Sequence, residues 1–405
     1  MSAGTVSPAL KRLASGIVAA AERAVRVNPP TKDEYLASIK SFLFLQYDQA
    51  LGTAVHATPV FEALKCAVPD AQISVACVGM AHNVLRYNPH ISRLIETPHP
   101  FDQFFAAGYV LRRAWPELGG LPVAIVTTTG SSRTRIALLG MLAGPGFRLG
   151  FTIARPLYHR VLVYDPMMSQ IDNNLRVIGA LGHTYEHSEP RVYFSPAEVD
   201  SARRMLAGQG INNGKPCAVM VTQVSGGQRT RWRDERFLAV AEHLRARGYQ
   251  ILFVGASAEA RDIDRLRTLL GRTSFSLAGK TDIPTLSAVL CLADLAVALD
   301  TGTMHVGRAA ELPMVVIAPA WQPAIEWLPL EREHCVVLRG PDLPVMPPDY
   351  CIDEVSSAQA IAAIDRLLKK FPPSPEARHA RIRLNLSGVL SGSRRKGVLN
   401  PEEMS

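Results

Sequence analysis

The stretch from Asp300 to His305 gathers a carboxylate, two hydroxyls, a glycine and an imidazole into the run Asp-Thr-Gly-Thr-Met-His. A helix beginning here would present backbone N–H groups that lack internal partners and carry the positive end of the helix dipole. Such a turn can bind a diphosphate: Gly302 lets the ligand approach the backbone, Thr301 and Thr303 supply hydroxyls, and His305 can donate to a phosphate oxygen. The alternative is a local role, in which Asp300 or Thr303 caps the helix and His305 is an ordinary surface histidine.

The sequence on either side of this turn has the pattern that would position it. An apolar run from Leu295 to Leu299 precedes it, and an Ala-rich helical pattern begins at about Met304 and stops before Pro313. A second apolar run covers Met314 to Ile317. We therefore predict a strand, a tight turn, a helix and a second strand, which is the repeating unit of a parallel sheet.

Another phosphate-binding loop is expected earlier, between an apolar strand at 217–222 and a helix at 234–247. This loop contains Ser225 and Gly226, and Arg229 and Arg231 follow closely. Flexible glycines and guanidinium groups suit phosphate contact. Glycine-rich turns near arginines are common without such a role, so the loop gains weight only beside the Asp300 turn.

The first half of the chain shows the same alternation of strands and helices, with strands expected at 41–47, 73–78, 93–96 and 123–128. This alternation predicts a doubly wound α/β domain. Functional side chains of such domains follow the carboxyl ends of the strands. After the first strand these are Asp48, Gly52, Thr53 and His56. After the fourth strand, Arg133 and Arg135 are candidates for binding an anionic acceptor.

Composition narrows the class of protein. The chain has 405 residues, 47% of them hydrophobic, and a net charge of +8, which suits more than one core and an anionic partner. No apolar run reaches the roughly eighteen residues needed to cross a bilayer, which predicts a soluble or peripheral protein. The six cysteines show no C-x-x-C spacing and are interpreted as reduced residues of a cytoplasmic protein.

Several motifs are missing or misplaced. The sequence has no G-x-x-x-x-G-K-S/T and no G-x-G-x-x-G after the first strand, which argues against an ATPase or a nicotinamide oxidoreductase. Asp262 and Asp264 form a D-x-D, but they lie in a predicted helix, where residues two apart point in different directions. Surface charge is the simpler interpretation of this pair, and no metal site is predicted.

The expected organisation has five parts. A basic amphipathic segment would precede two Rossmann-like domains that face a cleft, and a helix and a basic, mobile tail would follow. The predicted ranges are 1–38 for the extension, 39–205 for the acceptor-side domain, 206–350 for the domain that holds a nucleotide donor, 351–371 for the C-terminal helix and 372–405 for the tail.

Four stretches together resemble glycosyltransferase family 9, the ADP-heptose:lipopolysaccharide heptosyltransferases. They are "LGTAVHATPVFEALKCAVPDAQI", "SSRTRIALLGMLAG", "RTRWRDERFLAVAEHLRARGYQILFVGASAEA" and "LDTGTMHVGRAAELPMVVIAPA", and the resemblance covers roughly residues 40–370. It implies a GT-B fold whose C-terminal helix crosses back to the first domain. It also implies an inverting transferase that binds a nucleotide sugar mostly through its second domain and needs no metal.

The resemblance also implies roles for individual residues. The family's D-T/S-G-x-x-H, which faces the diphosphate and sugar, matches Asp300, Thr301, Gly302 and His305. The residue expected to take the ribose hydroxyls is Glu259, the backbone contact to the base falls at Thr281, and a small-residue pair beside the phosphates matches Ser225 and Gly226.

Two departures from the family pattern bear on activity. The first loop of the family reads L-G-D-x-x-H with the aspartate as general base, whereas this chain has Thr53, which cannot act as a base near neutral pH. Asp48 or His56 could replace it, although Asp48 could be a turn cap and His56 a helix-start residue. The lysine expected before Arg231 is Thr230, which leaves Arg229 or Arg231 to neutralise the leaving diphosphate.

Three functions follow as alternatives. The first is an active transferase with a relocated base, moving heptose from ADP-heptose onto a lipopolysaccharide-core or related anionic glycan. The second is a catalytically weak homologue that binds a sugar nucleotide or glycan, and the third is a nucleotide-sugar epimerase. For the transferase we expect a cytoplasmic protein in peripheral contact with the inner membrane, with no metal, no other cofactor and no nucleic-acid partner.

Overall fold

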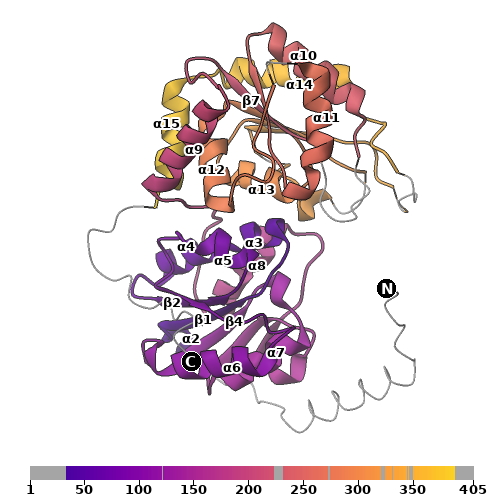
Figure 1. Cartoon of the computed structure of the whole chain (residues 1–405). Helices are drawn as coiled ribbons and strands as arrows, with labels where there is room; N and C mark the ends of the chain where they lie inside the picture. The colour runs from indigo at the N-terminus through magenta and orange to yellow at the C-terminus, as the bar shows by residue number, and fades with distance from the viewer. Residues whose placement is uncertain are drawn as a thin grey trace.

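The computed structural model describes residues 33–120, 122–222, 231–271, 274–320, 324–330, 332–343, 345 and 350–387, and its two α/β units are stacked one above the other (Figure 1). Predictions that fall on other residues, including the amphipathic segment, Ser225, Gly226 and Arg229, lie outside the described part.

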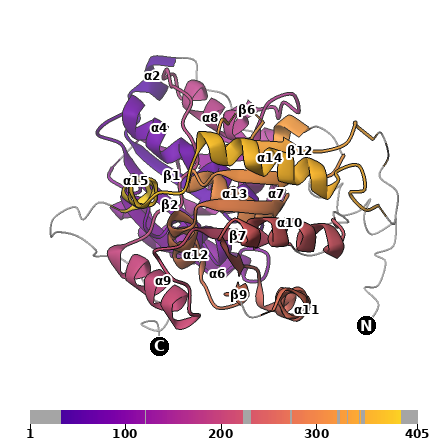
Figure 2. The same cartoon turned by 90° about the horizontal axis from the view of Figure 1, so that it is seen from above.

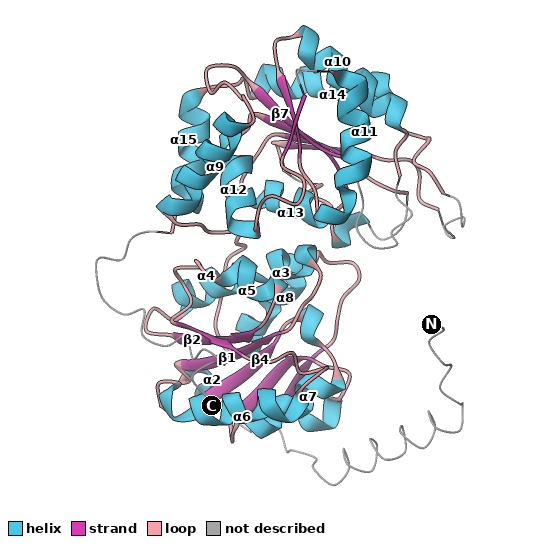
Figure 3. Cartoon of the chain, in the orientation of Figure 1, coloured by secondary structure: helices cyan, strands magenta, loops and turns pink. Residues whose placement is uncertain are grey.

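The first unit contains six parallel strands in the order β3-β2-β1-β4-β5-β6. All residues of β1 and β4 are buried, as expected for strands covered by helices on both faces. The helices α3, α4, α5 and α8 lie on the side of the second unit, and α6 and α7 lie on the far side (Figure 3). The elements are α2 (Asp33–Ala37), β1 (Ser41–Gln46), α3 (Leu51–Ala57), α4 (Pro59–Ala67), β2 (Gln72–Cys77), α5 (Met80–Leu85), β3 (Arg93–Glu96), α6 (Phe104–Ala114), β4 (Val123–Thr127), α7 (Thr134–Ala143), β5 (Phe147–Phe151), β6 (Arg160–Leu162) and α8 (Gln170–Ala180).

The second unit repeats this topology with the strand order β12-β11-β10-β7-β8-β9, again all parallel. Seen from above, α14 and α10 cover one end of the molecule, with β7 and α13 beneath them (Figure 2). The elements are α9 (Pro196–Gly208), β7 (Cys217–Val221), α10 (Asp234–Ala246), β8 (Gln250–Phe253), α11 (Ala260–Leu270), β9 (Ser274–Ser276), α12 (Ile283–Leu292), β10 (Leu295–Leu299), α13 (Gly302–Ala309), β11 (Met314–Ile317), β12 (Cys335–Leu338), α14 (Ser357–Lys370) and α15 (Pro375–Asn385).

Both sheets therefore share the doubly wound order in which the chain reverses direction between two central strands. These switch points lie between β1 and β4 in the first sheet and between β7 and β10 in the second. Loops that leave the carboxyl ends of such strands diverge and open a crevice where ligands bind. The loops that begin at Tyr47, Thr128 and Asp300 stand at these two points, as does Thr222 just after β7.

The packing of α9 shifts the boundary between the units. The helix was assigned to the first domain, up to residue 205, but it packs against α12 of the second unit. Its N-terminus is fixed by a capping box between Ser195 and Glu198. The chain therefore passes from one unit to the other before this helix, in the segment 182–195.

The prediction of a mobile tail from residue 372 is wrong for its first part, which forms α15 and packs against α12. Arg378 forms an ion pair of 2.5 Å with the buried Asp294, and Arg381, only 7% exposed, donates to the carbonyl oxygens of Cys291 and Ala293. From the sequence these arginines were interpreted as exposed charges of a tail, because their partners lie about 90 residues away in the chain. The helices α14 and α15 both pack on the second unit.

Candidate functional site

A cavity of about 900 Å³ lies between the two units, at the switch points of both sheets. The first unit contributes the start of α3, and the second contributes the turns after β8, β9 and β10. Its walls include Gln49, Gly52, Thr53, Gly255, Ser257, Glu259, Thr281, Asp300, Thr301, Gly302, Thr303, His305, Glu326 and Trp327. The cavity thus brings together nine of the residues singled out in the sequence, from both halves of the chain: Gly52, Thr53, Glu259, Thr281, Asp300, Thr301, Gly302, Thr303 and His305.

The turn after β10 opens into this cavity as expected, but the helix begins two residues earlier, at Gly302. Its N-cap residue is Thr301, whose backbone is extended and whose side chain makes no capping bond. The Thr301 hydroxyl oxygen is buried without a partner among the described residues. The local role for Asp300 or Thr303 as a cap is therefore wrong, and the free N–H groups of α13 and an unused hydroxyl remain available to a ligand.

The loops of the two units fit together through their glycines. A Cβ atom on Gly52 would lie 2.6 Å from Cδ2 of His305, and one on Gly302 would lie 2.7 Å from Cβ of Leu51. Real Cβ atoms do not approach other atoms so closely, so any side chain at either position would push α3 and α13 apart. The two glycines thus set how tightly the units close around the cavity.

A pair of buried histidines joins the same two helices. Nε2 of His56, near the end of α3, lies 3.0 Å from Nδ1 of His305, and the ring of His56 stacks on Trp327 at 5.3 Å. Burial is the main cause that lowers the pKa of both imidazoles, to about 3 for His305, so both are neutral at physiological pH. Neither prediction of an ordinary role, a surface His305 or a helix-start His56, is correct.

The surroundings of the pair select one arrangement of its protons. If His305 donated from Nδ1, His56 would carry its proton on Nδ1, which is buried without a partner in the described chain. An unpaired buried donor is costly. In addition, the lone pair of His305 Nε2 would face the Asp300 carboxyl, whose Oδ1 lies 3.9 Å away. We therefore assign the donor to His56 Nε2, which leaves His305 with an Nε2–H on the side of Asp300 and the cavity.

Asp48 has the most unusual environment of the predicted catalytic residues. It is 5% exposed, burial raises its pKa to about 7 despite the opposing charge of Arg133, and its Oδ2 has no partner in the described part of the chain. The N-cap of α3 is Ala50, so Asp48 does not cap that helix. A Cβ atom on Gly130 would lie 2.0 Å from Asp48 Oδ1 and 2.4 Å from Cγ2 of Thr53, so only glycine leaves room for this carboxyl.

Two further predicted residues line the cavity on the side of the second unit. Oε2 of Glu259 accepts a hydrogen bond of 2.8 Å from the backbone N–H of Ala256 and lies close to Gly255. This bond holds the carboxylate at the end of β8, where a ribose would be expected. Thr281 follows β9 and completes this wall.

The predicted arginines lie elsewhere. Arg231 is mostly exposed and its guanidinium lies 3.7 Å from Asp234, outside the lining of the cavity. Arg135 donates to the carbonyl oxygen of Phe101. The guanidinium carbon of Arg133 lies 5.3 Å from the centre of the Phe101 ring. Neither Arg133 nor Arg135 lines the cavity between the units. The pair Asp262 and Asp264 is exposed on α11, as expected of surface charge.

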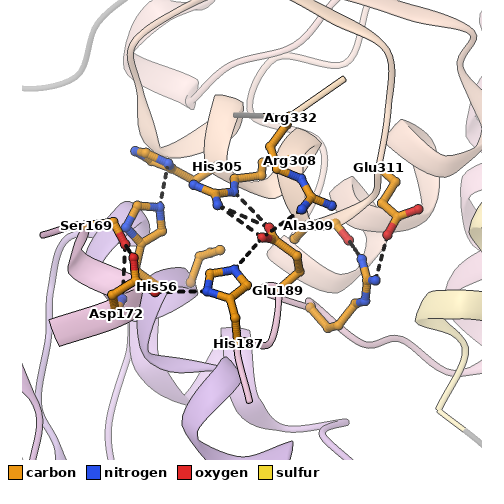
Figure 4. A network of polar contacts seen from close by, with 12 residues as sticks. His56, Ser169, Asp172, His187, Glu189, His305, Arg308, Ala309, Glu311 and Arg332 are labelled. Atoms are coloured by element: carbon orange, nitrogen blue, oxygen red, sulfur yellow. Dashed lines mark hydrogen bonds and ion pairs between the residues drawn. The ribbon is translucent and has the colours of Figure 1, made fainter. Parts of the chain in front are cut away.

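Sequence reasoning missed the polar cluster that ties α13 to the segment between the units (Figure 4). Glu189 of that segment contacts Arg308 of α13 and Arg332, both at 3.1 Å, and His187 at 2.7 Å, and His187 also contacts Asp172 of α8. Burial opposes the ionisation of Glu189, but these partners lower its pKa to about 2. Its bonds to Asp172 and Glu189 raise the pKa of His187 to about 9. The cluster therefore remains charged near neutral pH and holds the C-terminal end of α13 in place.

Within the described residues, no group of three or more histidine, cysteine, aspartate or glutamate side chains is arranged to hold a metal ion. The described helices also include none that is long and apolar enough to span a membrane.

Two Rossmann-like units around a cavity at both switch points are the architecture of the GT-B fold. The model of glycosyltransferase family 9 (heptosyltransferase) matches residues 135–335, and the chain resembles this family over that part. Among curated proteins it is 25% identical over 342 residues to lipopolysaccharide heptosyltransferase 3 of Escherichia coli, covering 78% of this chain and 96% of the relative.

Solved structures show the same fold. The glycosyl transferase family 9 protein of Veillonella parvula superposes with a TM-score of 0.71 at 20% identity, covering 85% of this chain and all of that one. The E. coli ADP-heptose lps heptosyltransferase II superposes with a TM-score of 0.66 at 16% identity, covering 82% and 99%.

Proposed function

We propose that the protein transfers a heptose from ADP-heptose to a lipopolysaccharide-core acceptor, with inversion at the sugar carbon and without a metal ion. The names of the relatives support heptose as the sugar, ADP as the nucleotide and lipopolysaccharide as the acceptor. The observation that carries the proposal is the unsatisfied start of α13, where free N–H groups, the unpaired Thr301 hydroxyl and the Nε2–H of His305 converge on the cavity.

In this mechanism the diphosphate of the donor lies at the start of α13, and the adenosine lies toward Glu259 and Thr281. The N–H groups and His305 bind the leaving diphosphate more strongly as its negative charge grows, which is the part that a cation plays in other transferases. With the diphosphate held on one side, the acceptor hydroxyl attacks the sugar carbon from the other. A new carbon–oxygen bond forms as the bond to the diphosphate breaks.

The proton of the acceptor hydroxyl goes to Asp48. A general base is most effective when its pKa lies near the working pH, and burial brings the pKa of Asp48 to about 7. Thr53, which lines the cavity beside it, orients the acceptor without taking the proton. His56 acts through His305 and does not touch the substrate.

The test is product formation from ADP-heptose and other nucleotide sugars with a lipopolysaccharide-core acceptor, followed by mass spectrometry. We expect one heptose to be added and ADP to be released in equal amount. If no donor yields a product while ADP still binds, transfer is rejected.

A second candidate function, binding of a sugar nucleotide or glycan without turnover, is favoured by one observation. Thr53 occupies the position of the expected base, and Asp48 is only 5% exposed. Any clear glycosylated product excludes this candidate. Mass spectrometry of the surface glycolipid from cells lacking the protein provides the matching test in vivo.

For a lipid-linked acceptor we also propose a peripheral location on the cytoplasmic face of the inner membrane. The net charge of +8 supports attraction to anionic lipids.

A further inference from the structure

Glu326 lies at the junction of the two units, in the segment that follows β11. It lines the cavity between the units and also a smaller cavity, of about 570 Å³, against the first unit. The next residue, Trp327, lines the cavity between the units as well, and its ring lies 6.0 Å from the ring of His305. Glu326 and Trp327 therefore lie beside the turn that holds the diphosphate in the proposed reaction.

The strand order shows which part of the donor would reach this segment. In the second sheet β11 lies on one side of β10, and β7, β8 and β9 follow on the other side. The proposed nucleoside contacts, Glu259 and Thr281, come after β8 and β9, and the proposed diphosphate turn comes after β10. In a parallel sheet these loops all leave from the same edge. The segment after β11 thus lies beyond the diphosphate turn as seen from the nucleoside, which is where the transferred sugar must lie.

One oxygen of Glu326 is held by side chains of the first unit. Oε1 accepts a hydrogen bond of 2.6 Å from the Tyr164 hydroxyl and one of 2.8 Å from Nε2 of Gln170. The same Nε2 donates to the Tyr164 oxygen at 3.0 Å, and Oε1 of Gln170 accepts from Thr129 at 2.6 Å. Burial and the bond to Glu326 raise the pKa of Tyr164, so the phenol keeps the proton that it donates. The carboxylate is therefore fixed by partners that are themselves fixed.

The other oxygen of this carboxylate is unused. Both hydrogen bonds go to Oε1, and Oε2 of Glu326 has no partner among the described residues. A carboxylate oxygen can only accept hydrogen bonds, and a sugar offers hydroxyl donors. The negative charge would also repel an acidic group brought into the same cavity. A fixed, free acceptor beyond the diphosphate turn therefore suits a sugar that carries hydroxyl groups and no acid.

We propose that Glu326 determines which sugar is transferred. Its Oε2 accepts hydrogen bonds from hydroxyl groups of the donor sugar, and its charge excludes a donor whose sugar is acidic. Tyr164 and Gln170 are positioning residues that act on the sugar only through Glu326. Because both belong to the first unit, selection of the sugar requires the two units together. The assignment rests on the proposed transfer reaction, which sets the direction of the donor in the cavity.

The first test compares ADP-heptose with ADP by calorimetric titration of the full chain without an acceptor. Glu326→Ala should weaken binding of ADP-heptose about tenfold or more, because a hydrogen bond to a charged group is lost, and leave ADP affinity unchanged. Glu333→Ala is the matched control, because Glu333 is an exposed glutamate of the same unit that lines neither cavity. Wild-type affinity of Glu326→Ala for ADP-heptose would overturn the proposal.

The second test concerns the charge. Because Tyr164 and Gln170 both donate, the amide oxygen of Glu326→Gln should replace Oε1 and its NH2 group should replace Oε2. The free acceptor then becomes a neutral donor. The probe is ADP-heptose whose primary hydroxyl has been oxidised to a carboxylate. The wild type should bind ADP-heptose about tenfold or more tightly than this acid, and Glu326→Gln should lose that preference. The same preference in both proteins would overturn selection by charge.

The third test separates positioning from a general structural effect. Tyr164→Phe removes one of the two donors to Oε1 and should weaken ADP-heptose binding several-fold, with ADP affinity unchanged. In a Glu326→Ala background the same change should have no further effect, because Tyr164 acts through the carboxylate. An equal loss in both backgrounds would show that Tyr164 does not act through Glu326.

Failure of this assignment and failure of the transfer reaction give different results. If ADP-heptose affinity depends on Glu326 but the wild type transfers no sugar to any acceptor, the reaction is rejected and the sugar contact is kept. If the wild type transfers heptose and Glu326→Ala and Glu326→Gln leave kcat/KM for ADP-heptose unchanged, the reaction is kept and the sugar contact is rejected.

Discussion

The loop after β1 and the turn after β10 lie at the switch points of the two sheets and carry the same kinds of residue. Each contributes an aspartate, a glycine, a threonine and a histidine, Asp48, Gly52, Thr53 and His56 in the first and Asp300, Gly302, Thr303 and His305 in the second. In the second unit the helix begins two residues after the aspartate and opens its N–H groups to the cavity. In the first unit the aspartate turns inward against Gly130.

The two aspartates therefore suit different chemistry. Burial raises the pKa of both aspartates, to about 6 for Asp300 and about 7 for Asp48. Only Asp300 lines the cavity between the two units. The comparison teaches that one supersecondary unit can serve as an anion site or as the holder of a base. Which role it takes depends on whether its helix or its carboxylate faces the ligand.

The largest effect is expected from removing the base. Asp48→Asn keeps the shape of the side chain but cannot accept the proton, so turnover should fall by roughly 100- to 10,000-fold with ADP affinity unchanged. Single-turnover rates and calorimetric titration with ADP measure the two quantities. Asp300→Asn is the comparison variant, and it should weaken ADP binding as well. If Asp48→Asn turns over at the wild-type rate, the two loops do not differ as described.

The pH profile tests the same difference in the wild type. Because Asp48 acts as a base only when ionised, kcat/KM should fall about tenfold for each pH unit below a pKa near 7. A midpoint near the ordinary value for aspartate, about 4, would exclude Asp48 as the base.

The stability of the fold should also depend on the ionisation of Asp48. Stability should fall as the pH rises, whereas kcat/KM should increase. The folded protein binds this proton more tightly than the unfolded chain, because the pKa rises from 3.8 to about 7 on folding. The free energy of unfolding should therefore decrease as the pH rises from about 4 to about 7. Asp48→Asn should remove this decrease and raise the Tm at pH 8 relative to the wild type. If the difference in Tm between pH 5 and pH 8 is the same in Asp48→Asn as in the wild type, the burial of the Asp48 carboxyl is contradicted.

The contact between the loops is tested by Gly52→Ala. The new methyl group would lie 2.6 Å from the ring of His305, and overpacking of this kind typically costs about 1–3 kcal/mol. We expect a lower Tm and weaker ADP binding together. Gly208→Ala on α9 is the control, since nothing lies within 4 Å of the added atom, and it should be neutral. Full ADP affinity in Gly52→Ala would show that the closure is looser than the structure indicates.

The smallest effect is expected from the histidine pair. His56→Phe removes the donor that holds His305 in its Nε2–H form, and ADP affinity should fall by about tenfold or less. His56→Gln can restore a donor at the same place and should recover much of the loss. Nitrogen NMR of His305 should show Nε2 protonated in the wild type and a mixture of tautomers in His56→Phe. Protonation on Nδ1 in the wild type would reverse the assignment.

The central strands β1, β4, β7 and β10 were predictable because each is a largely apolar run. The strands β1 to β4, β7, β10 and β11 lie where expected, within one residue at their ends. The outer strands β5, β6, β9 and β12 were not predicted. They are short or interrupted by polar residues: β5 contains the buried Arg148, which is compatible with a strand only because its guanidinium donates to the carbonyl oxygen of Leu157.

The sequence by itself determined the doubly wound fold and the tight turn and helix after β10, because both depend on local periodicity and on a motif that is contiguous in the chain. Only the tertiary structure decided the pairing of His56 with His305, which are 249 residues apart, and the burial that moves the pKa of Asp48. Desolvation and contact between distant segments are properties of the packed chain, and no short stretch of sequence records them.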